Sequence, residues 1–552
     1  MPELQRLLRH GALLNKISAL PGAWELGARL KDLRAERPIR RELARLAGDV
    51  ARQAPPPAEA GGRILVVSPH SWKFPLLVEV TTALAMRLRG ARVTVLACDG
   101  GVPHCDNRTV SFDPAGLCRV CWGRARRTLK AAGLDTLRIS ELAASPELDA
   151  ALAEIDRTPD DALAGVAIDG TSLWDVATTS YWRSMLAKGM TRGEIDRAAQ
   201  RGFLRATARA WIAVRAAIAR VEPTAILGLN GTFHVQAAAL RQARAHGIPF
   251  VNYEGGVVTS GTIHVHVDRA AADFDFGAAW AERAERPLAD EQRERIDEFL
   301  LRRRTGAGNP FRYLDRPKGR GDEILAARGL DPSRPTMVAF TNVLWDSAVI
   351  DKDVAFAGIT DWIRTFMAAL RESPERQAVF RIHPAELRVP RRQSIESLRD
   401  LILAEGAGAM PNVAVIGPEE ETDSYALMDV AESVHVYTTT AGLEAAAFGR
   451  PVVVAGGAHY AGKGFTFDLA SREQLATIVA GRLRPGADDE TVRLARRYAH
   501  FYFFEQMGSV PATEVATEYG TTTGELRAKT AGDLRPGHFP GLDALCDALG
   551  GR

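Results

Sequence analysis

The chain has 552 residues, of which 46% are hydrophobic and 25% charged, a composition typical of folded globular proteins and not of disordered or collagen-like ones. Because one core rarely grows beyond about 250–300 residues, this length predicts two domains with short extensions. Lys and Arg (70) nearly balance Asp and Glu (68), so we expect no nucleic-acid partner. No apolar run approaches the ~20 residues of a membrane span and no signal peptide is recognisable, so we expect a cytoplasmic protein.

Residues 1–58 are predicted to form a helical extension followed by a linker. Leu and Ile recur at helical spacing from Leu4 to Leu33, and three prolines follow at residues 55–57. The many arginines of residues 1–56 can hold such helices to an anionic membrane surface, which makes this segment a candidate peripheral membrane contact. The alternative is that the helices pack on the body of the protein or on a partner subunit.

Two halves follow, each with the strand, loop, helix, strand order that predicts a Rossmann-like, doubly wound α/β domain. Residues 59–325 are expected to form the acceptor domain and residues 326–485 the nucleotide-sugar domain, with C-terminal helices and a tail in residues 486–552. Open parallel sheets bind ligands at the carboxyl ends of their strands, so we expect the site in a cleft between the two halves. The predicted strands are residues 63–68, 93–97, 225–229, 249–253, 336–340, 378–382, 413–416, 433–437 and 451–454.

A hydroxyl-rich turn in residues 437–454 lies between a predicted strand and a predicted helix. Hydroxyls and free backbone N–H groups at a helix N-terminus favour a phosphate group. Glu444, in the first turns of that helix, can accept hydrogen bonds from ribose hydroxyls; the alternative is an ordinary capping run with a solvated glutamate. The residues predicted here to bind the nucleotide are Thr438, Thr439, Thr440, Gly442 and Glu444.

A second motif, with the sequence RIHPAE from Arg381 to Glu386, directly follows an apolar strand. Pro384 ends the strand, so His383 is expected at the carboxyl edge of the sheet, within reach of a phosphate or leaving group. Residues after the first strand of this half should line the same side, where Trp345 can stack on a base or simply pack, and Lys463 can neutralise the departing phosphate. The predicted donor-side residues are Asn342, Trp345, Asp346, His383, Pro384, Glu386 and Lys463.

These motifs, from about Val338 to Asp468, resemble the bacterial capsule polysaccharide biosynthesis glycosyltransferases. The run from Thr341 to Asp346 and the Ser424–Tyr425 pair contribute to the resemblance. It implies the GT-B fold and a nucleotide-sugar donor, which is CMP-activated in the Kdo and sialic acid transferases with related motifs. It also implies that the His383–Pro384 pair contacts the donor phosphate and that Thr439 and Thr440 assist it.

The general base is expected in the first half of the chain. The related transferases carry an acidic-acidic-Gly motif there, and its nearest match is Tyr253–Glu254–Gly255, with tyrosine at the first acidic position. A sugar hydroxyl is a poor nucleophile near neutral pH, so transfer needs a carboxylate or an imidazole to take its proton. Glu254 fits this role, although it can also be a loop glutamate in an ion pair, and His70 in the first strand-to-helix loop is the rival base.

Four of the five cysteines lie within one short stretch, with the spacing C-x6-C-x12-C-x2-C. Four thiolates gathered in a reducing compartment predict a structural metal site, with zinc preferred, an iron–sulfur cluster as the alternative and free or redox thiols as the simpler reading. His104 is an alternative ligand. The predicted metal ligands are Cys98, Cys105, Cys118 and Cys121.

The sequence therefore predicts a GT-B glycosyltransferase that moves a sugar from a nucleotide-sugar donor to a glycan or glycolipid acceptor of a surface polysaccharide. Its predicted catalytic residues are Glu254, His383 and His70. Two alternatives remain open: a nucleotide-sugar epimerase of the same fold, and a non-catalytic sugar-binding or scaffold protein.

Overall fold

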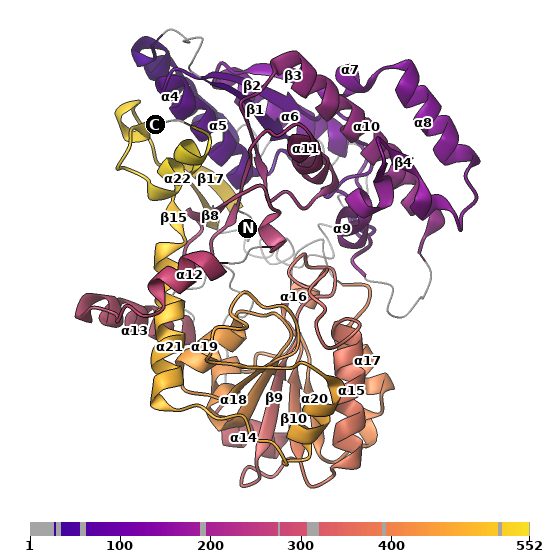
Figure 1. The fold of residues 1–552 in the computed structure, drawn as a ribbon, viewed down its shortest axis with the longest axis vertical. Helices are drawn as coiled ribbons and strands as arrows, with labels where there is room; N and C mark the ends of the chain where they lie inside the picture. Colours follow the sequence, from indigo (N-terminus) through magenta and orange to yellow (C-terminus); the bar gives the residue numbers. More distant parts are fainter. Residues whose placement is uncertain are drawn as a thin grey trace, which may run out of the picture. The chain divides into compact units, whose positions relative to one another are not determined.

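The structure is a computed structural model that describes residues 27–28, 35–55, 62–187, 195–273, 276–305, 319–388, 394–516 and 522–550. These residues form two compact α/β units, each built on its own sheet (Figure 1), as the repeated strand and helix pattern predicted. Unit 1 contains the described residues up to Ser184, residues 196–273 and those from 506 onward. Unit 2 contains the described residues of 185–195 and 274–505.

In the described part of unit 1, seven strands form a sheet that is parallel in its centre and antiparallel at one edge. Strand β1 (Arg63–Ser68) pairs on both sides, so that Val66 lies opposite both Val95 and Leu227. Because β1 is buried from Ile64 onward, its sequence is a continuous apolar run instead of an alternating one. In sheet order the strands are β15 (Gly508–Ser509), β8 (Thr262–Val267), β7 (Phe250–Gly255), β6 (Ala225–Leu229), β1, β2 (Arg92–Ala97) and β3 (Asp135–Arg138).

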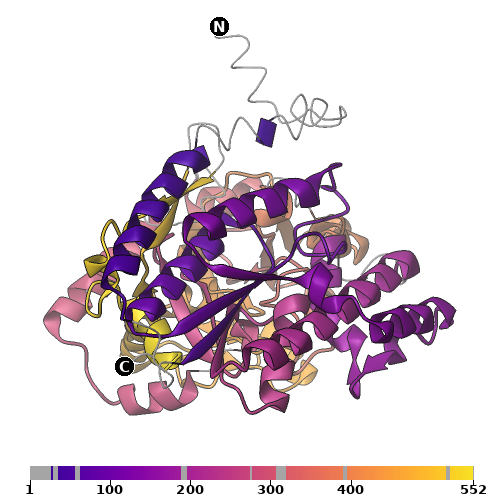
Figure 2. The ribbon, with the colours of Figure 1, turned by 90° about the horizontal axis from the view of Figure 1, so that it is seen from above.

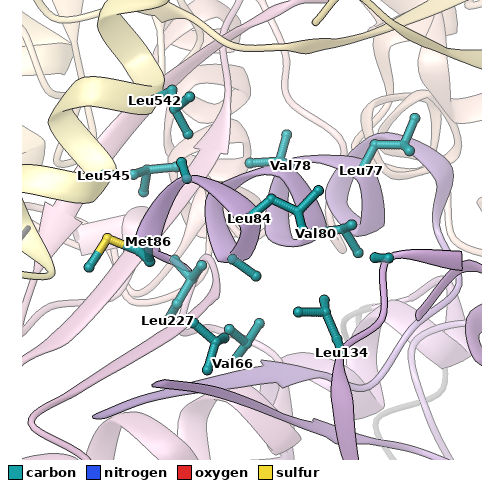
Figure 3. Close-up of a cluster of buried hydrophobic side chains, with 14 of the residues drawn as sticks. Val66, Leu77, Val78, Val80, Leu84, Met86, Leu134, Leu227, Leu542 and Leu545 are labelled. Carbon is teal, nitrogen blue, oxygen red and sulfur yellow. The ribbon is translucent and has the colours of Figure 1, made fainter. Parts of the chain in front are cut away.

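Helices cover both faces of this sheet (Figure 1). Helix α5 (Lys73–Leu88) packs on one face, and its Leu84 lies in one core with Val66 of the sheet and Leu542 of α22 (Pro540–Ala548), as Figure 3 shows. Figure 2 shows α4 (Arg37–Gln53) beside the yellow C-terminal segment, where α4 contacts β17 (Thr522–Leu526). The other elements of unit 1 are α6 (Leu117–Ala131), α7 (Ile139–Ala143), α8 (Pro146–Arg157), β4 (Ala167–Ile168), β5 (Thr171–Ser172), α9 (Leu173–Met185), α10 (Arg197–Val221), α11 (His234–Ala245), β16 (Ala512–Ala516) and β17 (Thr522–Leu526).

The described part of the predicted N-terminal extension packs on unit 1. Leu43, Leu46 and Val50 of α4 are buried in the core that also contains α5, so this helix follows the packing alternative and not the membrane one. The Leu and Ile pattern that begins at Leu4 lies almost entirely outside the described residues. Among the helices that the structure describes, none is long and apolar enough to span a bilayer.

The chain passes between the two units at residues that differ from the predicted domain boundaries. The chain leaves unit 1 at Asp273 and returns at Gln506, so the boundaries placed at residues 325 and 485 fall within unit 2. The Arg-rich helix α13 (Asp290–Arg304) belongs to unit 2, where its Arg303 pairs with Glu444.

In the described part of unit 2, six parallel strands form a sheet whose centre is the run β10, β9, β12. Its core includes Trp362 and Phe366 of α15, which are fully buried. In sheet order the strands are β11 (Val413–Ile416), β10 (Gln377–Arg381), β9 (Thr336–Phe340), β12 (Ala431–Val436), β13 (Val452–Val454) and β14 (Phe467–Asp468). The helices are α12 (Gly277–Arg283), α13, α14 (Gly321–Ala327), α15 (Ile359–Glu372), α16 (Ala385–Arg388), α17 (Leu398–Ala404), α18 (Ser424–Val430), α19 (Ala441–Ala447), α20 (Arg472–Val479) and α21 (Asp489–His500).

Candidate functional site

The loops that follow the three central strands of unit 2 are joined by direct hydrogen bonds. The backbone N–H of His383, after β10, donates to Thr341 Oγ1, after β9, over 3.0 Å. The backbone N–H of Thr438, after β12, donates to Asn342 Oδ1 over 3.3 Å. Three segments of the predicted donor site therefore meet at the carboxyl edge of one sheet, where parallel sheets bind their ligands.

His383 is a neutral hydrogen-bond donor at this edge. The backbone N–H of Ala385 donates to its Nδ1 over 3.1 Å, so the neutral ring carries its proton on Nε2. Burial lowers the pKa of His383 to about 4, with Asp346 opposing this effect and Arg381 adding to it. At neutral pH, the ring can therefore donate a hydrogen bond from Nε2 to a phosphate oxygen without carrying a charge of its own.

Thr438 has a buried hydroxyl that finds no hydrogen-bond partner among the described residues. An unmatched buried hydroxyl costs free energy, so such a group at the carboxyl end of β12 points to a ligand. Thr439 and Gly442 lie against the ring of Tyr460, whose hydroxyl donates to the carbonyl oxygen of Thr439 over 2.7 Å. A Cβ on Gly442 would lie 2.3 Å from the same hydroxyl, so glycine is required there for packing and not for access by a ligand.

The structure gives Glu444 a different role from the predicted contact with ribose. Its carboxylate is 3% exposed and accepts hydrogen bonds from Arg303 Nε, over 2.8 Å, and from the Tyr425 hydroxyl. Although burial acts to lower the pKa of Arg303, Glu444 beside it raises that pKa overall. The ion pair links α13 to α19. Because Arg303 and Tyr425 donate to the Glu444 carboxylate, its oxygens already have partners within the protein.

The polar groups of Glu386 and Trp345 also form hydrogen bonds within the protein. Glu386 is buried, which raises its pKa to about 7, and its two oxygens accept from the Ser397 hydroxyl and the Leu398 backbone N–H. The Trp345 indole N–H donates to Ser394 Oγ over 2.9 Å, and the ring packs in a small apolar cluster. Both residues therefore support the loops around His383, and Trp345 follows the packing alternative.

Three further donor-side residues lie on the loops of this edge. Pro384 begins the turn after β10, and the Asp346 carboxylate accepts the backbone N–H of Ala348 over 3.1 Å. Lys463 lies in the loop after β13, close enough to His459 to help burial lower the pKa of that imidazole. Thr440 is the residue that precedes α19, and its side chain forms no capping hydrogen bond.

In unit 1, the strand end of β7 holds Glu254 in a fixed orientation. Its Oε2 accepts from Asn230 Nδ2 over 3.0 Å and its Oε1 from the Gly255 backbone N–H over 2.9 Å. Asn230 follows β6, the neighbouring strand, so Glu254 lies at the carboxyl edge of the sheet and is half-buried there. This geometry suits a carboxylate that takes a proton from a substrate.

His70 belongs to a buried polar cluster that the sequence motifs did not predict. Its Nε2 lies 3.5 Å from Asp106 Oδ2, and the same oxygen lies 3.8 Å from His234 Nδ1. Although burial alone would raise the pKa of Asp106, His70 and His234 lower it overall. His70 Nδ1 faces Gln236, and the ring stacks on Trp72 at 4.2 Å, so its nitrogens face protein groups. The only signal for Asp106 in the sequence was its place beside Cys105.

Cys98, Cys105, Cys118 and Cys121 line one pocket in unit 1 and form no disulfide. Burial raises the pKa of Cys98 to about 11 and that of Cys105 well above its usual value. Within the described part of the chain, no three His, Cys, Asp or Glu side chains form a group that could hold one metal ion. The structure therefore does not support the preferred prediction of a single zinc ion.

Comparison with known proteins connects unit 2 to a family. Residues 318–496 match the family model described as capsule polysaccharide biosynthesis protein, whereas no curated protein matches the sequence. Among solved structures, the chain is similar to Thermosulfurimonas dismutans KpsC, a beta Kdo 2,4 transferase, with 17% identity over 56% of this chain and 87% of the other, at a TM-score of 0.32. It is also similar to the sucrose-phosphate synthase of Thermosynechococcus elongatus, with 14% identity over 80% and 94% of the two chains and a TM-score of 0.28. TM-scores this low carry no argument about function. The matched region contains β9, β10, β12 and the loops around His383, and the resemblance to the capsule polysaccharide biosynthesis proteins that the motifs predicted is confirmed there.

Proposed function

We propose that the protein is a glycosyltransferase that moves a sugar from a nucleotide-sugar donor to a glycan or glycolipid acceptor. The observation that carries the proposal is the junction of His383, Thr438 and Asn342 at the carboxyl edge of the unit 2 sheet, inside the region that matches the capsule family model. Following the predicted resemblance, we propose a CMP-activated sugar as the donor.

The proposed donor site binds a phosphate through neutral donors. His383 donates from Nε2 and Thr438 donates its hydroxyl, which has no partner among the described residues. Such groups stabilise the charge that develops on the phosphate as the bond to the sugar breaks, because they are oriented before the reaction begins. Lys463 supplies a positive charge from a neighbouring loop, and Thr439 and Thr440 complete the turn.

For the acceptor, we propose Glu254 as the general base in preference to His70. Glu254 is half-buried at a strand end and oriented by Asn230. His70 is 6% exposed, and its two ring nitrogens face Asp106 and Gln236. In the proposed step, the acceptor hydroxyl gives its proton to Glu254 as its oxygen bonds to the sugar carbon, and the nucleotide leaves with the electrons of the broken bond.

Ligand-induced stabilisation tests the donor class, because a ligand that binds only the folded state raises its apparent stability. The thermal midpoint is measured with CMP, CDP, UDP, GDP and dTDP at equal concentrations. A shift with CMP alone supports the proposed donor, and a shift with another nucleotide replaces it. Absence of any shift contradicts nucleotide binding and favours the scaffold alternative.

Product analysis separates the transferase from the epimerase. With the stabilising nucleotide sugar and no acceptor, an epimerase converts the sugar, whereas a transferase needs an acceptor to turn over. Acceptor-independent appearance of an epimeric sugar would overturn the proposal.

A further inference from the structure

One pocket at the carboxyl end of β2 gathers four cysteines from two separate segments. Cys98 directly follows β2 and Cys105 lies in the next turn of the loop, while Cys118 and Cys121 come from the first turns of α6. The other walls of the pocket are Pro69, His70, Gly100, Val102, Asn107, Arg108 and Leu117.

The backbone of the loop is shaped to bring these thiols to the pocket. Gly100 has φ +100°, a conformation that favours glycine. A Cβ added at this residue would lie 3.7 Å from Cys118 Cβ. Gly101 packs so closely on α7 that a Cβ there would lie 2.8 Å from the Ser140 backbone nitrogen. The loop can therefore follow this path only with glycine at these positions.

The side chains that line this pocket suit a metal centre bound through sulfur. None of the four cysteines forms a disulfide, and four thiols around one pocket are the ligand set of thiophilic metal centres. The Arg108 guanidinium donates to Cys118 Sγ over 3.4 Å and is itself held by Asp113. A hydrogen bond to a ligand sulfur and a nearby positive charge both stabilise an anionic metal–thiolate group.

A single metal ion and a metal cluster need different arrangements of their thiols. A single zinc ion needs all its sulfurs about 2.3 Å from one point, which places the thiols in contact with one another. No described group of three ligands has that arrangement. A [4Fe–4S] cluster has a body of its own, and each of its four cysteines binds a different iron, so the thiols lie around a pocket.

We infer that Cys98, Cys105, Cys118 and Cys121 bind an iron–sulfur cluster that fastens the loop between β2 and α6. The fastened loop carries Asp106 to its place beside His70. This inference does not rest on the proposed transferase function, and its test requires no activity.

The test is the metal content of the full-length protein, purified without oxygen from iron-supplied cells. Iron, zinc and acid-labile sulfide are quantified, and the visible absorption is recorded. We expect about four iron and four sulfide per chain, with broad sulfur-to-iron absorption, as for a [4Fe–4S] cluster held by four cysteines. The double variant Cys118→Ala, Cys121→Ala should lose iron, sulfide and absorption together.

Cys546 provides a matched control, because it is a buried cysteine of α22 outside the pocket. Cys546→Ala should keep the wild-type iron and sulfide content. Should the double variant fail to fold, metal-free wild-type protein treated anaerobically with ferrous iron and sulfide gives the same answer. One zinc per chain without sulfide would overturn the cluster, and no metal in either the purified or the treated protein would overturn the site.

Discussion

The exchange Thr438→Val removes one hydroxyl from the proposed donor site and keeps the shape of the side chain. In the free protein this hydroxyl is buried and has no partner among the described residues, an arrangement that costs about 1–3 kcal/mol. Valine avoids this cost, so the variant without ligand should unfold at a higher temperature. For a unit of this size, each kcal/mol corresponds to about 2–4 °C in the midpoint.

Nucleotide binding should change in the opposite direction. A hydrogen bond to a charged phosphate contributes about 1.5–3 kcal/mol, so its loss should weaken binding of the stabilising nucleotide roughly tenfold to a hundredfold. Calorimetric titration gives the Kd, and thermal melts with and without nucleotide give both effects in one experiment.

Thr477→Val is the matched control, because the half-buried Thr477 donates its hydroxyl to the Glu473 carbonyl within helix α20. It should leave the Kd unchanged. The reasoning is refuted if Thr438→Val lowers the melting temperature of the free protein and leaves the Kd at the wild-type value, since the hydroxyl would then serve the fold.

Three further predictions concern both units. Glu254→Gln should lower the transfer rate about 10²–10⁴-fold, measured by product chromatography, while the thermal shift with nucleotide persists; loss of both would show that Glu254 supports the fold. Arg303→Ala leaves the buried Glu444 without its cation and should cost about 3–5 kcal/mol in urea unfolding. The matched control is Arg302→Ala at the exposed neighbouring position, which should cost less than about 0.5 kcal/mol. Equal costs for the two variants would contradict the predicted contribution of the buried Arg303–Glu444 pair. Burial raises the pKa of Glu79 from 4.5 to about 8, so the folded protein keeps a proton that the unfolded chain releases, and stability falls as pH rises through this interval. By pH 7 the free energy of unfolding should have fallen by roughly 3 kcal/mol. Glu79→Gln should flatten the dependence of this free energy on pH, measured by urea unfolding from pH 5 to 7. An unchanged dependence would assign it to other groups.

Local patterns in the sequence identified the parts of the fold that depend on near neighbours. The apolar run of residues 63–68 predicted a strand buried on both faces, because a central parallel strand has no solvent side. Pro384 after an apolar strand predicted the position of His383, since proline ends the strand wherever the rest of the chain lies. The close spacing of Cys118 and Cys121 likewise predicted that they share a site, and the structure places both on one pocket.

The tertiary structure decided which polar groups are occupied. Glu444 pairs with Arg303, 141 residues away, and this partner turns a predicted ribose ligand into a core ion pair. Asp106 reaches His70 across a loop, and the chain returns to unit 1 at its C-terminal end, where β15 pairs with β8. Periodicity and spacing report how a residue relates to its neighbours along the chain, whereas the partner of a buried charge is set by packing between distant segments, which leaves no local pattern.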